Sequence, residues 1–217
     1  MIHVWINKSQ FEYDIHSLVK AFYPGEEVKV GVAGEGEVPG AAKTAAEDGR
    51  ADDCQRKTKD AEKLTDIYID FDENEIAVWL GEKIAGKAAR REFSPDSGRP
   101  EIKNVLKQLL YQALSENLGR RLPWGTLTGI RPTKIPMGWL EEGRSEEEIL
   151  ADMERKYYIS PEKGRLSIDI AQREKELLST LHYKDGYSLY IGIPFCPTTC
   201  LYCSFTSYPI GLWKKRV

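Results

Sequence analysis

Three cysteines near the end of the chain follow a C-x3-C-x2-C pattern: Cys196, Cys200 and Cys203, within YIGIPFCPTTCLYCSF at 190–205. The apolar run Tyr187 to Ile193 comes directly before them, and such a run is typical of a buried strand. The pattern therefore predicts a strand that leads into a loop carrying three thiols.

Three thiolates on a short loop suit iron–sulfur ligation. Thiolates are the soft ligands that hold these clusters, and a loop of this length can place three of them around one cluster. The fourth iron of a cubic cluster then stays open. The spacing therefore predicts a cluster held by Cys196, Cys200 and Cys203.

Two other uses of these cysteines fit less well. A structural zinc site needs four ligands, and only Cys200 and Cys203 form a C-x2-C pair, so His182 would have to complete the set. A disulfide is disfavoured because three is an odd number, no secretory signal precedes the motif, and thiols stay reduced inside cells.

Composition and charge describe a soluble globular protein. Of the 217 residues, 41% are hydrophobic and 30% charged. We expect no membrane span, because no apolar run reaches the roughly 18 residues required. The opening sequence MIHVWINKSQ does not resemble a signal peptide, so we expect a cytoplasmic location. A net charge of -3 gives no electrostatic reason to expect a nucleic-acid partner.

The first part of the chain predicts a strand, a helix and a second strand. Residues 2–6 alternate weakly, and Ser9 with Glu12 predicts a capping box at the start of a helix that ends before Pro24. The alternating valines of 28–32 follow as the second strand.

Residues 34–63 contain almost no large apolar side chain, which predicts a mobile insertion. Cys54 lies in it and has no cysteine or histidine neighbour. Residues 67–71 and 76–80 then predict a hairpin, and 83–93 allows a further strand. We interpret nearby acidic residues as the hairpin's solvated face and turn rather than a metal site: Asp66, Asp70, Asp72, Glu73 and Glu75.

Helices are predicted after this hairpin. An apolar stripe follows Pro100 over 102–118 and ends at Gly119. Ser145 and Glu148 predict a second capping box. Ser160 and Pro161 predict the start of a helix that runs to about residue 181.

The segment LPWGTLTGIRPTKIP, residues 122–136, is rich in turn-forming residues and carries Arg131 and Lys134. It is either a rigid connector or a binding loop. We favour the connector, because its glycines do not form a phosphate-binding loop.

The cysteine motif and the words around it resemble the radical S-adenosylmethionine (radical SAM) enzymes. Within that class, YIGIPFC resembles the opening of the oxygen-independent coproporphyrinogen III oxidases, and residues 122–135 and 190–211 look like the HemZ-type coproporphyrinogen dehydrogenase branch. The resemblance implies an oxidoreductase of porphyrin and haem biosynthesis that converts coproporphyrinogen III to protoporphyrinogen IX by oxidative decarboxylation.

The same resemblance implies the roles of individual residues. Cys196, Cys200 and Cys203 would hold a [4Fe-4S] cluster, and Tyr190 and Tyr202 match positions that contact S-adenosyl-L-methionine. An electron donor such as flavodoxin or ferredoxin is implied as a partner. Cationic side chains should meet the substrate's propionates, with Arg131 as a candidate. No catalytic residue beyond these is implied.

Two positions depart from the oxidase pattern. Gly192 stands where the oxidases carry histidine, and Phe205 stands where they carry a further cysteine. Phe205 is shared with the related haem-chaperone branch. A haem-binding chaperone-like relative, or a non-catalytic tetrapyrrole-binding or interaction module, therefore remains an alternative.

The patterns and the resemblance together predict three regions. A small α+β domain occupies 1–98, a helical linker region 99–183, and the first strand of an incomplete radical SAM (β/α) barrel 184–217. Only 14 residues follow Cys203. We therefore expect an N-terminal fragment, inactive by itself, with the next helix beginning at Lys214-Lys215-Arg216.

Overall fold

The computed structural model describes residues 1–32, 66–81, 88–129, 131–181, 185–198 and 200–213. These residues divide into two compact units, Met1–Lys175 and Glu176–Val217. In the described part of the chain, no helix has the length and apolar character needed to cross a bilayer.

A five-stranded mixed sheet forms the base of the first unit. Its spatial order is β2-β1-β3-β4-β5. β1 pairs in parallel with β2 and β3, whereas β3–β4 and β4–β5 are antiparallel, which confirms the predicted strand–helix–strand and hairpin. The strands are β1 Ile2–Ile6, β2 Val28–Val32, β3 Asp66–Phe71, β4 Glu75–Leu80 and β5 Ala89–Glu92.

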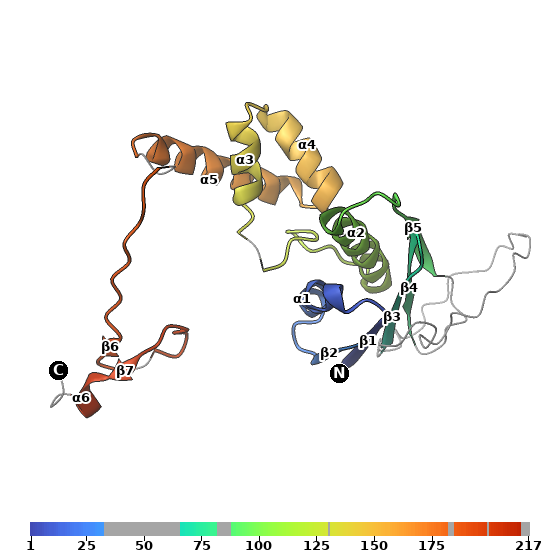
Figure 1. Cartoon of the computed structure of the whole chain (residues 1–217), viewed down its shortest axis with the longest axis horizontal. Helices are drawn as coiled ribbons and strands as arrows, with labels where there is room; N and C mark the ends of the chain where they lie inside the picture. The colour runs from blue at the N-terminus through green and yellow to red at the C-terminus, as the bar shows by residue number, and fades with distance from the viewer. Residues whose placement is uncertain (33–65, 82–87, 130, 182–184, 199, 214–217) are drawn as a thin grey trace, which may run out of the picture. The chain divides into compact units, whose positions relative to one another are not determined.

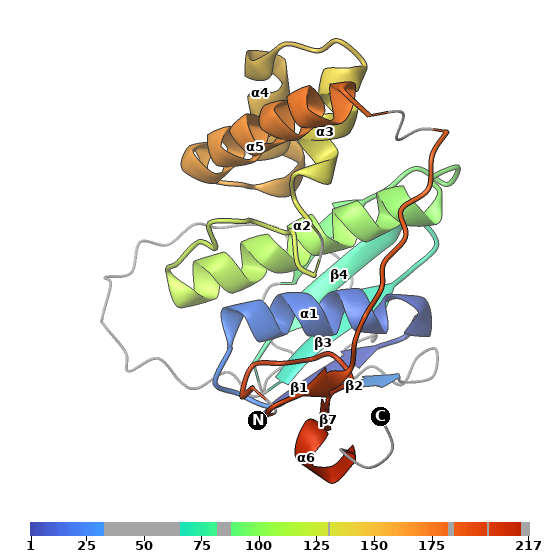
Figure 2. The same ribbon diagram turned by 90° about the vertical axis from the view of Figure 1, so that its left-hand side faces the viewer.

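Two helices cover one face of this sheet. They are α1 (Glu12–Phe22) and α2 (Arg99–Leu118), which lie on the same side of the strands in Figures 1 and 2. Alternate residues of β1 and β3 point toward these helices and are buried: Ile2, Val4, Ile6, Ile67, Ile69 and Phe71. They share one core with apolar residues of both helices. The helix α2 therefore packs with the sheet and α1 as part of one core.

The start of α1 differs from the prediction. Ser9 begins a short 3₁₀ turn, Ser9–Phe11, and α1 itself starts at Glu12 with no side-chain cap. The predicted Ser9–Glu12 capping box is therefore wrong. Phe11 is fully buried and its ring stacks on that of Phe71 at 5.2 Å, so core packing sets this helix start.

Three further helices pack around a second apolar cluster in the same unit. They are α3 (Lys134–Glu141), α4 (Glu146–Tyr157) and α5 (Pro161–Ser179). The capping box of Ser145 and Glu148 is confirmed, with both of its hydrogen bonds present. The Ser160 hydroxyl accepts from the Lys163 amide at 3.3 Å, which confirms the predicted start of α5. The cluster's buried members are Ile149, Met153, Ile159 and Ile168.

Asp152 joins three cations on α4 and the preceding loop. Its carboxylate lies 2.5 Å from the Arg155 guanidinium, 2.9 Å from that of Arg144 and 3.1 Å from the Lys156 ammonium. Hydrogen bonds from Arg155, Arg144 and Lys156 hold the pKa of Asp152 well below the usual carboxyl value. Arg144 and Lys156 also lie over the Trp139 ring, at 4.7 and 5.1 Å.

The connection between α2 and α3 is held tightly against the end of α4. Gly125 has φ +55°, and the Thr126 amide donates to the Tyr157 carbonyl at 2.8 Å. A Cβ on Gly125 would lie 1.9 Å from that carbonyl oxygen. Only glycine, which has no Cβ, therefore allows the backbone at position 125 to approach the Tyr157 carbonyl this closely.

The second unit contains little regular structure. β6 (Phe195–Cys196) pairs in parallel with β7 (Tyr208–Pro209), and the short helix α6 (Ile210–Trp213) follows. The strand predicted over 187–193 is wrong, because these residues form no strand and are exposed. A strand needs a hydrogen-bonded neighbour, and within this unit the described residues offer only β7, which pairs with β6.

Several expectations fall outside the described residues. They concern the insertion at 34–63 with Cys54, residues 83–87 of the strand allowed over 83–93, His182 as a zinc ligand, and Lys214-Lys215-Arg216 as the start of a helix. The described part of 83–93 contains β5. The division of the chain at residues 98 and 183, and the barrel itself, also stay predictions.

We expect Gly125→Ala to lower the free energy of unfolding by about 3 kcal/mol or more, since a left-handed backbone and a clash with a carbonyl add. Gly119→Ala is the matched control: its φ is +63°, but nothing lies within 4 Å of the added Cβ. It should cost only about 1–2 kcal/mol. Chemical denaturation measures both, and equal losses would contradict the close approach.

We expect Asp152→Asn to lower the thermal midpoint at pH 7. Because the folded-state pKa is depressed, the stabilisation is present above the unfolded carboxyl pKa, about 3.9, and is lost as pH falls below it. The difference from the wild type should therefore shrink in acid. Asp169→Asn on α5 is the control, since that exposed carboxylate has no ion pair among the described residues. A pH-independent difference would refute the ion network's role.

Candidate functional sites

Cys196 ends strand β6, and Cys200 and Cys203 follow before β7 begins. Figure 1 shows β6 and β7 side by side. Cys196 and Cys203 are half-buried, Cys200 is exposed, and all three are free thiols. The Cys203 amide donates to the Cys200 carbonyl at 3.0 Å, so a turn joins the second and third cysteines. The Cys203 sulfur lies 3.9 Å from the Phe205 carbonyl oxygen.

The two ends of this loop are tied together. Phe195 pairs with Tyr208 and Cys196 with Pro209, and the Tyr208 amide donates to the Pro194 carbonyl at 2.6 Å. The rings of Phe195, Tyr208 and Trp213 contact one another, with centroids 5.6 to 6.2 Å apart. Cys196 therefore stands at the closed base of the loop.

The thiols fit an iron–sulfur cluster in chemistry and accessibility. They are unpaired, lie on one short loop, and reach the surface. They do not converge into a preformed site, since the described residues contain no group of three Cys, His, Asp or Glu side chains placed to hold a metal ion. Cluster binding would have to bring the three thiols closer together.

The two tyrosines proposed to contact S-adenosyl-L-methionine are strongly exposed. Tyr190 is 82% and Tyr202 91% exposed, so the structure places neither in a cavity. A Cβ on Gly192 would lie 3.1 Å from Cε1 of Tyr190. The glycine that departs from the oxidase pattern thus gives this ring room beside the backbone.

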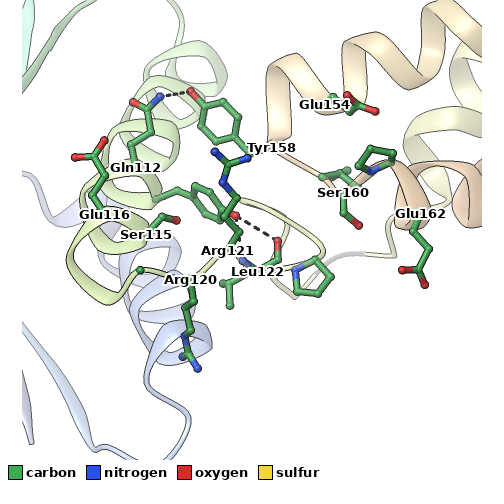
Figure 3. A pocket seen from close by; sticks show the side chains of 15 residues that line it. Gln112, Ser115, Glu116, Arg120, Arg121, Leu122, Glu154, Tyr158, Ser160 and Glu162 are labelled. Carbon is green, nitrogen blue, oxygen red and sulfur yellow. Dashed lines mark hydrogen bonds between the residues drawn. The ribbon is translucent and has the colours of Figure 1, made fainter.

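The first unit contains an open cleft of about 1030 Å³ between the C-terminal end of α2 and the junction of α4 and α5 (Figure 3). Tyr158 lines it in a left-handed conformation, φ +57°, and its hydroxyl accepts from Gln112 Nε2 at 2.9 Å. The Leu122 amide donates to the Tyr111 hydroxyl at 3.0 Å. Ser115 Oγ is buried without a hydrogen-bond partner.

The charges of this cleft are mixed. Its lining includes Arg120 and Arg121 together with Glu116, Glu154 and Glu162. The Arg120 guanidinium already donates to the Phe22 carbonyl. The substrate expected from the resemblance carries propionate groups. A ligand with several carboxylates would meet more negative than positive side chains here, so the cleft does not suit it.

Arg131, the proposed propionate contact, does not line this cleft. Its side chain is 60% exposed, and its guanidinium lies 4.0 Å from the Glu174 carboxylate. The neighbouring segment 122–129 packs on the end of α4. Its Thr128 hydroxyl accepts a hydrogen bond from the Lys107 ammonium at 3.1 Å. These contacts support the connector interpretation of residues 122–136.

One curated relative matches the chain strongly. It is the oxygen-independent coproporphyrinogen-III oxidase-like protein HemZ of Bacillus subtilis (strain 168), 41% identical over 130 residues. The match covers 58% of this chain but only 26% of the relative's length. The chain is therefore similar to an oxidase-like protein over about a quarter of that protein.

Neither of the other comparisons adds to this likeness. No family model matches the chain. No solved structure resembles it significantly.

Sequence reasoning missed both the cleft and the contact among Phe195, Tyr208 and Trp213. The cleft is built from residues 111–123 and 154–162, two stretches that no sequence motif connects. The three aromatic residues were visible around the cysteines, but their contact depends on the β6–β7 pairing. A search for aromatic residues at both ends of the cysteine loop would have found them.

We expect the iron-free native chain to react with a thiol-specific alkylating reagent at Cys196, Cys200 and Cys203 without prior reduction. Cys200 should react fastest, because it is exposed and the other two are half-buried. Mass spectrometry of proteolytic peptides measures each rate. A disulfide between any two of them in the purified chain would contradict this assignment.

Proposed function

We propose that this chain supplies the cluster-binding loop of a radical SAM oxidoreductase of the coproporphyrinogen III oxidase type. The observation that carries the proposal is the C-x3-C-x2-C set of free thiols on one closed loop. The similarity to an oxygen-independent coproporphyrinogen-III oxidase-like protein supports it independently.

In this proposal Cys196, Cys200 and Cys203 hold a [4Fe-4S] cluster through their thiolates. When bound, the cluster supplies one electron for cleavage of S-adenosyl-L-methionine, and a flavodoxin or ferredoxin delivers that electron. The chain's part is to hold three thiolates at fixed spacing and leave one iron open. Tyr190 and Tyr202 would cover the cofactor and exclude water from it.

The proposed substrate is coproporphyrinogen III, converted to protoporphyrinogen IX by oxidative decarboxylation of two propionates in the cytoplasm. The described part of the first unit lends this no direct support, because its cleft carries three carboxylates against two guanidinium groups. Substrate contacts are therefore expected mainly from residues beyond those described.

A haem-binding chaperone-like relative is the second candidate. It is favoured by Phe205, which is 76% exposed and brings no fourth thiol to the loop. Such a protein would keep the cluster and the cofactor but would release no carbon dioxide from coproporphyrinogen.

We expect the chain, reconstituted with iron and sulfide without oxygen, to bind both in comparable amounts. Replacing the three motif cysteines by serine should reduce bound iron at least about tenfold, because serine is a poor ligand for iron–sulfur clusters. Cys54→Ser is the matched control and should retain the iron. Iron and sulfide analysis with the visible spectrum gives the readout, and an iron-loaded triple variant would reject the proposed site.

The two candidate functions can be distinguished by experiment. The experiment uses a longer protein that contains this sequence and has the length of the HemZ relative. Reductive cleavage of S-adenosyl-L-methionine tests the radical SAM class. Carbon dioxide release from coproporphyrinogen III then tests the oxidase, and haem binding with cofactor cleavage but without decarboxylation supports the chaperone-like relative. The chain by itself should show no turnover.

A further inference from the structure

The cysteine loop is closed by very little backbone pairing. β6 and β7 contain two residues each, and one further bond runs from the Tyr208 amide to the Pro194 carbonyl. Isolated two-stranded pairs of this length are marginal in water. Some other interaction must therefore keep the two ends of the loop together.

The described side chains of this unit offer one such interaction. Phe195 lies 6.1 Å from Tyr208 and 6.2 Å from Trp213, and Tyr208 lies 5.6 Å from Trp213 in an edge-on arrangement. These three rings come from β6, β7 and α6. Phe195 and Trp213 are half-buried, in contrast to Leu212, which is 81% exposed.

The position of Phe195 couples these rings to the first cysteine. Phe195 and Cys196 are successive residues of β6, so their side chains point to opposite faces of the strand. When the Phe195 ring is held against Tyr208 and Trp213, the Cys196 thiol must therefore point to the opposite face of β6. Cys200 lies farther along the loop, is exposed, and is not held in this way.

We infer that Phe195, Tyr208 and Trp213 form an aromatic clamp that positions Cys196 as the anchored ligand of the cluster loop. This rests on the proposed function as far as the cluster is concerned. In the iron-free chain the clamp already orients the Cys196 thiol by holding β6 in place. With a cluster bound, it limits how far the loop can open to release iron.

The first test uses the iron-free full chain and the alkylation rate of each thiol. Trp213→Ala should raise the rate at Cys196 several-fold and leave Cys200, already exposed, nearly unchanged. Trp213→Phe should restore the slow rate at Cys196, because a smaller ring still contacts Phe195 and Tyr208. Leu212→Ala is the neighbouring control and should behave as the wild type.

The second test follows iron loss to a chelator from the reconstituted chain without oxygen. Trp213→Ala should lose iron about tenfold faster than the wild type, the range found when groups that orient metal ligands are removed. Trp213→Phe and Leu212→Ala should lose it at the wild-type rate. Circular dichroism of the first unit's helices confirms that each variant is folded.

The outcomes distinguish the clamp from the cluster assignment. If Trp213→Ala matches Leu212→Ala in both tests, the clamp is refuted while the cluster site stands. A wild-type chain that binds no iron overturns the proposed function. The clamp is then supported or refuted by the alkylation rates alone. Equal acceleration at Cys196 and Cys200 would show general unfolding of the loop and would also refute the clamp.

Discussion

The first unit depends on burial of one apolar sheet face beneath α1 and α2. β1 and β3 pair in parallel and alternate buried with more accessible residues, so both strands contribute to a single core. This burial supplies the main driving force for folding, since each large apolar side chain removed from water contributes about 1.5–3 kcal/mol. The turn before α1 follows from it, because burial of Phe11 overrides the local capping preference.

The helical part of the same unit is joined to this core through close backbone contact. Gly125 allows the connection after α2 to lie against the carbonyl groups that end α4. The cleft lined by Tyr111 and Tyr158 opens beside this contact. Its mixed charges do not suit a ligand that carries several carboxylates.

The second unit is stabilised by different interactions from the first. Its described residues form almost no buried apolar core, and they are held by a two-residue strand pair and three aromatic rings. Three free thiols on such a loop suit the assembly of a cluster, which itself supplies the interactions that gather the ligands. The similarity to an oxygen-independent coproporphyrinogen-III oxidase-like protein agrees with this interpretation but spans about a quarter of that protein.

Local pattern determined much of this protein from sequence alone. The alternation in 67–80, the Ser145–Glu148 capping box and the Ser160-Pro161 helix start depend on neighbours a few residues apart, and all agree with the structure. The cysteine spacing is equally local, which is why it predicts a chemistry without predicting a fold.

Tertiary structure decided what depends on distant partners. The apolar run 187–193 is not a strand, because strand formation requires a neighbour that no local pattern supplies. The same reason explains the start of α1, the cleft and the contact among Phe195, Tyr208 and Trp213. Each arises from residues far apart in sequence that only packing brings together.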